Sequence, residues 1–228
     1  MKIAEIYKSV QGEGLLTGTE SVFVRASGCN LRCWFCDTSY SSWKPEGRDL
    51  TVNEIFEQVV SHECQHVIVT GGEPMLYAEL IPLCTTLKTA NRHITIETAG
   101  TLYLPLKCDL MSISPKFASS APTAENEPRW QRRHEQTRHA PRVLRQLLQE
   151  HDYQIKFVID APEDCNTAED YLVEFPEIDR HRVFMMPQGT DPKRLSRIGQ
   201  WLEPYCAEQG LLYCPRKQIE WFGLVRGT

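Results

Sequence analysis

Residues 26–40, ASGCNLRCWFCDTSY, hold three cysteines within eight positions. Cys29, Cys33 and Cys36 are spaced C-x3-C-x2-C, and no fourth cysteine follows nearby. A structural zinc ion takes four protein ligands, usually from two paired motifs. Each iron of a cubane cluster takes one external ligand, so three thiolates leave one iron free to bind a small molecule. The spacing therefore favours an iron–sulfur cluster with one open corner.

A zinc site is the alternative interpretation of the same cysteines. The stretch HECQH could add His62, Cys64 or His66 as a fourth ligand. We expect His62 to close a helix and His66 to open a buried strand, so this trio is better explained as an element boundary. Trp34 and Phe35 favour the cluster, because aromatic rings between the ligands can shield it from water and tune its potential.

Composition limits the class of protein. The 228 residues suit one domain with a sizeable core, and the net charge of −5 argues against a general nucleic-acid surface. The first residues lack the features of a signal peptide, and no apolar run approaches the roughly 20 residues that span a bilayer. We therefore expect a cytoplasmic protein with no membrane partner. In that reducing compartment, clustered cysteines more often bind metal than cross-link.

Short apolar runs alternate with helical patterns, which is typical of a parallel sheet covered by helices. We expect strands at 21–27, 66–72, 93–98, 108–114, 153–159, 182–187 and 211–215. We expect helices at 51–62, 76–90, 142–151, 167–175 and 192–208. The first of these begins with a capping box, in which Thr51 is the N-cap and Glu54 lies three residues on.

The predicted fold is α/β: an abbreviated, open (partial) TIM-type barrel of about six parallel strands with fewer covering helices. A barrel of eight units needs roughly 250 residues, which is more than this chain has. The connection between 93–98 and 108–114 barely leaves room for a crossover helix. We expect a single domain over residues 1–228, with a polar insertion at about 117–141.

Four motifs in this order resemble the radical S-adenosylmethionine (SAM) superfamily: CNLRCWFC, TGGEP, ETAGT and SISPK. Each of the last three follows the carboxyl end of an expected strand, where α/β folds place their sites. The resemblance implies a [4Fe-4S] cluster held by Cys29, Cys33 and Cys36. It also implies SAM contacts at Phe35, Asp37, Gly72, Glu73, Thr98, Ser114, Pro115 and Lys116.

SVQGEG, FVRASGCNLRCWFCDT, TGGEP, SPK and the final CPRKQIEWFGLVRGT resemble the 7-carboxy-7-deazaguanine synthase family. That resemblance implies a radical SAM carbon–nitrogen lyase. Its reaction is hydrogen abstraction at C6 of 6-carboxy-5,6,7,8-tetrahydropterin, ring contraction and loss of ammonia to give 7-carboxy-7-deazaguanine, a precursor of queuosine. The resemblance also implies Mg²⁺ and a homodimer.

The resemblance places the pterin among Val10, Gln11, Gly12, Glu13, Arg25 and Thr70. Arg25 could grip the substrate carboxylate as a bidentate pair, although a surface ion pair is the simpler explanation. Thr38 offers the hard oxygen that Mg²⁺ prefers, and a local turn hydroxyl is its alternative role. Related sequences often carry a histidine near Gln218, so a substrate contact from the C-terminal segment is in question.

The insertion carries a basic cluster: Arg129, Arg132, Arg133, His134, Arg138, His139 and Arg142. A solvated loop leading into a helix explains it simply. The alternative is a docking patch for an acidic electron donor such as flavodoxin. Two other functions stay open: a radical SAM activase of a glycyl-radical enzyme, and a zinc-stabilised interaction domain.

Overall fold

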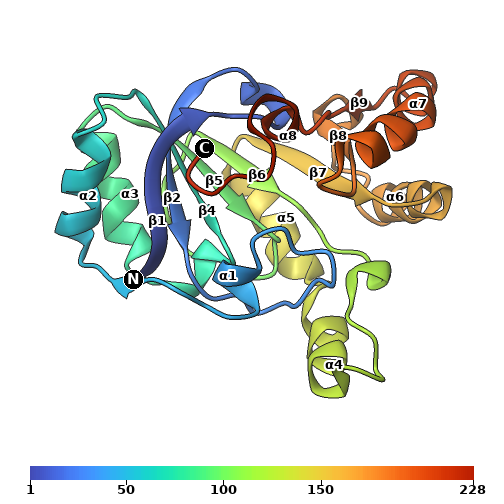
Figure 1. Cartoon of the computed structure of the whole chain (residues 1–228), viewed down its shortest axis with the longest axis horizontal. Coiled ribbons are helices and arrows are strands. Elements are labelled where there is room, and N and C mark those ends of the chain that lie inside the picture. Colours follow the sequence, from blue (N-terminus) through green and yellow to red (C-terminus); the bar gives the residue numbers. More distant parts are fainter.

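The computed structural model describes residues 1–228 and contains one sheet with the strand order β3-β1-β2-β4-β5-β6-β7-β8-β9 (Figure 1). The strands are β1 (Lys2–Val10), β2 (Glu20–Ala26), β3 (Arg48–Asp49), β4 (His66–Gly71), β5 (His93–Thr98), β6 (Leu110–Ile113), β7 (Tyr153–Ile159), β8 (Val183–Pro187) and β9 (Leu212–Tyr213). From β2 to β9 all neighbours pair in parallel. The two ends of the sheet do not meet, so the predicted open barrel of about six parallel strands is confirmed, with β9 as a short seventh.

The helices are α1 (Ser39–Ser42), α2 (Val52–Val60), α3 (Leu80–Thr89), α4 (Pro128–Thr137), α5 (Pro141–Glu150), α6 (Pro162–Glu174), α7 (Pro192–Gln209) and α8 (Lys217–Phe222). The 3₁₀ turns are Gly14–Leu16, Pro74–Leu76, Ala118–Ser120 and Arg180–Arg182. The predicted capping box opens α2, where the Thr51 hydroxyl and the Glu54 carboxylate each satisfy the other's backbone N–H. No helix is long and apolar enough to cross a bilayer.

Two strands were not expected. β1 pairs antiparallel with β2 over most of its length, and β3 adds two residues beyond it. The charged residues of β1 hid this strand, because an antiparallel strand need not be apolar on both faces. As expected, β5 and β6 are joined without a helix.

The boundaries of two helices also differ from the prediction. α6 begins at Pro162 rather than near residue 167, because the Asp164 carboxylate accepts from the N–H groups of Asp160 and Ala161 and caps the first turn. α3 begins at Leu80, and the residues before it form the turn Pro74–Leu76.

The two faces of the parallel strands differ in chemistry. Residues pointing to the helices are apolar and share one buried core, for example Val22 and Val24 of β2 and Ile155 and Phe157 of β7. The alternate residues line a cavity instead, and several of them are polar: Arg25, Thr70, Glu97, Ser112 and Lys156. A strand of period two thus supplies the core on one face and functional groups on the other.

Candidate active site

A cavity of about 540 Å³ lies on the inner face of the sheet, towards the carboxyl ends of the parallel strands. The C-terminal segment crosses this face, and the labelled C-terminus lies over the central strands (Figure 1). The cavity is lined by most of the predicted site residues: Val10, Gln11, Gly12, Glu13, Arg25, Cys29, Cys33, Phe35, Cys36, Asp37, Thr38, Thr70, Gly72, Thr98, Ser114 and Lys116. The structure therefore gathers motifs that are far apart in the sequence around one space.

The three predicted cluster ligands come from the loop that leaves β2. All three cysteines are free and half-buried, and they line the same cavity. Burial raises the pKa of Cys29 to about 12 and that of Cys33 to about 11. A metal reverses this preference, because it binds the thiolate. The Leu31 N–H donates to the Cys29 Sγ at 3.4 Å, and the Cys36 Sγ lies 3.1 Å from the Ser42 hydroxyl.

The geometry around the thiols does not resemble a single-ion site. No group of three or more His, Cys, Asp or Glu side chains is gathered closely enough to hold one metal ion. His62 follows α2 and His66 begins β4, as expected for an element boundary. Three thiols that face one cavity suit an iron–sulfur cluster in which one iron keeps an open corner.

The polar segment 117–141 supports the cysteine loop. It contains the helix α4, which apolar periodicity did not predict because Trp130 and His134, rather than aliphatic residues, form its inner face. His134 is fully buried, and its Nδ1 accepts from the Arg32 N–H at 3.3 Å. The Arg32 guanidinium lies 3.8 Å from the centre of the Trp130 ring. This segment is therefore more than a solvated loop, although Arg129, Arg132 and Arg133 are exposed.

Two tryptophans attach the cysteine loop to its surroundings. The Trp34 indole N–H donates to the Ser119 carbonyl at 2.9 Å, and the Trp34 backbone N–H donates to Ser120 at 3.1 Å. The Trp43 indole N–H donates to the Cys33 carbonyl at 3.0 Å. These bonds satisfy backbone groups of a loop that has few internal partners, and so they limit its motion.

The TGGEP motif separates into three residues that line the cavity, Thr70 to Gly72, and two buried ones that do not, Glu73 and Pro74. Thr70 and Gly72 line the cavity, whereas Glu73 is fully buried within the protein. The Glu73 carboxylate accepts from the N–H groups of Met75 (3.1 Å) and Ala99 (2.9 Å) and from the Thr98 hydroxyl (2.8 Å). Burial raises the pKa of Glu73, and those three bonds oppose the rise. Glu73 therefore joins the ends of β4 and β5.

Glycine is required at position 72 by close packing. A Cβ there would lie 2.1 Å from the Gly28 carbonyl oxygen and 2.7 Å from that of Ser41. Both contacts are to backbone, so they cannot be relieved by a rotamer change. The strand end of β4 thus touches the start of the cysteine loop directly.

The SPK motif also divides. Lys116 points into the cavity, and its Nζ donates to the Ser114 carbonyl (2.7 Å) and hydroxyl (2.6 Å). Burial lowers the pKa of Lys116, and Coulombic attraction to Cys33 and Cys29 in their thiolate forms opposes this shift. Pro115 lies outside the main cavity and borders a smaller one of about 200 Å³.

On the opposite wall, Arg25 is held by residues of β1. Its Nε lies 2.6 Å from the Glu5 carboxylate, and its Nη2 donates to the Tyr7 hydroxyl at 2.7 Å. The Arg25 side chain is 15% exposed, so this is a partly buried pair that faces the cavity. The guanidinium keeps donors free for an anionic ligand.

The family was identified by comparison with known proteins. The Radical SAM superfamily model matches residues 23–120. A 7-carboxy-7-deazaguanine synthase of Rhodopirellula baltica is 45% identical over 227 residues, which cover 99% of this chain and 88% of the relative. A second protein of the same name, from Halobacterium salinarum, is 40% identical over 229 residues, which cover 96% of this chain and 89% of the relative. The chain belongs to the 7-carboxy-7-deazaguanine synthase family.

A solved structure supports the same fold. The crystal structure of QueE from Escherichia coli superposes with a TM-score of 0.69 at 20% identity, covering 94% of this chain and 92% of that one. Membership of the Radical SAM superfamily implies a [4Fe-4S] cluster and SAM. The three thiols on one cavity agree with that requirement.

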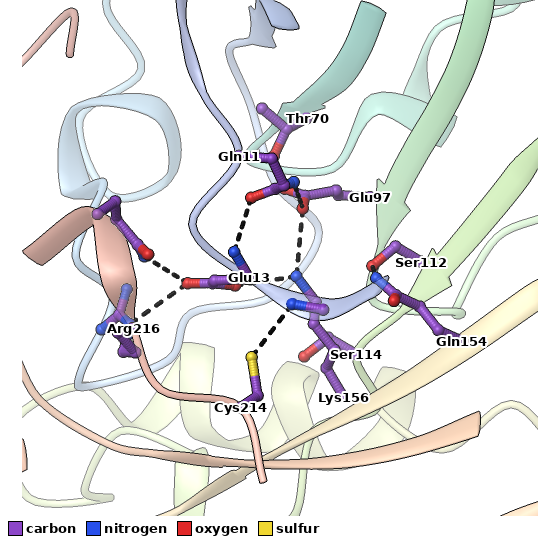
Figure 2. A network of polar contacts seen from close by, with 12 residues as sticks. Gln11, Glu13, Thr70, Glu97, Ser112, Ser114, Gln154, Lys156, Cys214 and Arg216 are labelled. Carbon is purple, nitrogen blue, oxygen red and sulfur yellow. Dashed lines mark hydrogen bonds and ion pairs between the residues drawn. The ribbon is translucent and has the colours of Figure 1, made fainter. Parts of the chain in front are cut away.

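Five charged residues that line this cavity were not among the predicted site residues: Glu5, Glu97, Lys156, Arg216 and Arg226. Lys156 of β7 lies 2.9 Å from Glu13 and 3.2 Å from Glu97 of β5, as Figure 2 shows. Arg216, just before α8, lies 3.3 Å from Glu13 and also pairs with Asp37. The missed signal was a charge inside an apolar strand, as in HITIET and YQIKFVI, since such residues are seldom buried unless they are paired.

The C-terminal segment reaches the cavity despite the absence of a histidine near Gln218. The Gln218 amide donates to the Glu13 carboxylate at 2.5 Å. Residues 223–228 line the cavity as well. The question raised by the missing histidine is thus answered in part: the segment is present at the site, with an amide in that place.

Proposed function

We propose that this chain, acting as a single radical SAM domain, converts 6-carboxy-5,6,7,8-tetrahydropterin to 7-carboxy-7-deazaguanine with loss of ammonia. The observation that carries the proposal is the shared cavity, which joins an open set of three thiols to a wall of polar groups suited to a pterin. When bound, the cluster, which Cys29, Cys33 and Cys36 would hold, and SAM would supply the radical chemistry for hydrogen abstraction at C6 of the substrate. The product would serve deazapurine synthesis, including queuosine.

The residues of the cavity contact different groups according to where they lie. Cys29, Cys33 and Cys36 hold the cluster, and Gly72 offers backbone close to them. Thr98, Ser114 and Lys116 border the nucleoside of SAM, while Phe35 and Asp37 flank it from the cysteine loop. Glu73 and Pro115 act from behind this surface: Glu73 holds the backbone of the two strand ends in place through its three accepted hydrogen bonds.

The substrate side is formed by Val10, Gln11, Gly12, Glu13, Arg25 and Thr70. A pterin presents amide and amine groups on its ring edge and, here, a carboxylate on C6. Gln11 and Glu13 suit the ring edge, and Arg25 suits the carboxylate. Thr38 would contribute an oxygen to Mg²⁺, which prefers hard oxygen ligands and would supply positive charge for the substrate carboxylate.

The test is anaerobic incubation of the reconstituted protein with SAM, dithionite and the carboxypterin, with mass detection of 7-carboxy-7-deazaguanine. Formation of this product supports the proposal. A backbone radical on a partner protein, without this product, would instead support a glycyl-radical activase. Cys33→Ala should retain the fold and lose the product, because it removes one of three ligands. Omission of Mg²⁺ and Thr38→Ala test the metal separately.

The electron donor is proposed to dock on α4. Arg129, Arg132 and Arg133 are exposed there, and Trp34 beside the cysteine loop is 51% exposed. An acidic flavodoxin complements this charge and would approach the cluster closely. Arg132→Glu/Arg133→Glu should weaken flavodoxin-supported turnover and reduce its salt dependence, while dithionite-supported turnover stays unchanged. If flavodoxin-supported turnover and its salt dependence are the same as in wild type, the proposed docking site is wrong.

We also propose a homodimer, following the family resemblance. Trp221, Leu224 and Val225 near the C-terminus are exposed apolar residues that a second copy could cover. Sedimentation velocity of the cluster-loaded protein distinguishes a monomer from a dimer.

A further inference from the structure

Lys156 is a buried cation for which the proposed reaction has no role. It lies on the inner face of β7, and its side chain is only 5% exposed. Its ammonium contacts two carboxylates from separate parts of the chain, Glu13 after β1 and Glu97 of β5 (Figure 2). Both glutamates line the cavity that would take the pterin.

The ammonium of Lys156 lies between the two carboxylates and contacts both. The Glu13 and Glu97 oxygens that contact it lie no farther apart than the two contact distances combined, so their charges would repel strongly without it. Burial alone would lower the pKa of Lys156, but Glu13 and Glu97 raise it above its ordinary value. Burial alone would raise the pKa of Glu13, yet Lys156 and Arg216 hold it at about 2.

Further bonds orient the two carboxylates. Glu97 accepts from the Thr70 hydroxyl at 2.7 Å and from the Gln11 amide at 3.2 Å. Glu13 accepts from the Gln218 amide at 2.5 Å and from Arg216 at 3.3 Å. A carboxylate has about four acceptor positions, so each retains capacity for a ligand in the cavity.

We propose that Lys156 is a positioning residue that keeps Glu13 and Glu97 as a fixed pair of anions, which together accept hydrogen bonds from the N–H-rich edge of the pterin ring. This inference rests on the function proposed above. A protonated carboxyl accepts less well and presents a donor, so both anions are needed to read an edge of several N–H groups. Lys156 itself need not touch the substrate.

Other ionisable groups face Glu13, Glu97 and Lys156, and they must be the same in all the proteins that are compared. Arg216 contacts Glu13 from the C-terminal segment, Lys116 approaches from the loop after β6, and Cys214 lies after β9. Burial raises the pKa of Cys214 to about 12, so its thiol stays neutral. All variants below retain these three groups.

The experiment measures equilibrium binding of the carboxypterin to cluster-loaded protein without SAM, under anaerobic conditions, by tryptophan fluorescence from pH 5.5 to 8. The quantity compared is the ratio of each variant's Kd to that of wild type, which cancels titration of the pterin. Lys156→Met should raise Kd about 10- to 100-fold at pH 8, the loss expected for one or two charged hydrogen bonds. The ratio should grow towards pH 5.5, because the Glu13 carboxylate, which Lys156 no longer holds as an anion, then takes up a proton.

Three further variants isolate the cause. Lys156→Arg keeps the charge and should give a smaller, pH-independent ratio. Lys156→Met/Glu97→Gln removes the like-charge pair, so binding should remain weak while the pH dependence disappears, and this variant also serves if Lys156→Met does not fold. Lys88→Met removes a lysine–aspartate pair outside the cavity, at 2.6 Å from Asp109, and should match wild type.

An unchanged Kd, or a ratio that does not vary with pH in Lys156→Met, would overturn the role of Lys156. The role is supported if the Kd ratio of Lys156→Met grows towards pH 5.5 while that of Lys156→Met/Glu97→Gln does not change with pH. If wild type neither binds nor converts the carboxypterin, the proposed function fails and this inference falls with it. If wild type does both, a flat ratio refutes only the inference.

Discussion

His134 offers a sharp test of how α4 is held against the cysteine loop. Its Nδ1 accepts from the Arg32 N–H, so the proton of the neutral ring is on Nε2, which lies 2.9 Å from the Ser120 hydroxyl. That hydroxyl in turn donates to the Phe117 carbonyl at 2.6 Å. Protonation of Nδ1 would set two N–H donors against each other. Burial lowers the pKa of His134 to about 4.

The sign of the pH effect follows from this depressed pKa. The unfolded chain takes up a proton at His134 as pH falls below about 6.5, whereas the folded chain does so only near 4. Stability is therefore lost progressively between these values and is unaffected above them. At pH 5 the difference amounts to about 2 kcal/mol of unfolding free energy.

The assay is urea unfolding of the protein before cluster reconstitution, at pH 7.5 and pH 5, for wild type, His134→Gln and His139→Gln. Other titrating groups are common to all three proteins. The fall in unfolding free energy from pH 7.5 to 5 should be about 2 kcal/mol smaller in His134→Gln than in wild type. The exposed His139, paired with Glu174 at 3.0 Å, serves as the control and should behave like wild type. Equal falls in wild type and His134→Gln, within about 0.5 kcal/mol, would refute the reasoning.

Substitutions at three other positions test the site. Glu73→Ala leaves three buried donors without an acceptor and should lower the free energy of unfolding in urea by about 3 kcal/mol or more. Glu73→Gln keeps an acceptor, so its free energy of unfolding should fall by less. Equal losses in the two variants would contradict this role of Glu73. Gly72→Ala forces the backbone at Gly72 away from Gly28 and Ser41 and should lower the free energy of unfolding by about 1 to 3 kcal/mol. It should also lower the amount of iron bound per chain, and full iron content would contradict this prediction. Arg216→Met leaves Asp37 without its ion-pair partner and removes one of the two cations that pair with Glu13. It should therefore lower the free energy of unfolding at pH 7, measured in urea, by about 3 kcal/mol. An unchanged free energy of unfolding would mean that these contacts are not made.

Much of the architecture followed from local patterns. The strands at 93–98 and 153–159 have the predicted bounds, because compact apolar runs ended by polar or turn residues leave little ambiguity. α4 was not predicted, since a helix whose inner face is a tryptophan and a histidine has no aliphatic period. β1 was not predicted either, because it is half polar and is paired on an edge of the parallel array.

The sequence by itself determined the three clustered thiols, the order of motifs after the strands and the open α/β array, because each of these depends on residue type and spacing along the chain. Only the tertiary structure decided which charges meet. These four charged residues are separated by up to 203 positions: Glu13, Glu97, Lys156 and Arg216. Their contact depends on strand register and on the path of the C-terminal segment. It also decided that Glu73 faces inward, since burial is a property of packing in space and not of the motif.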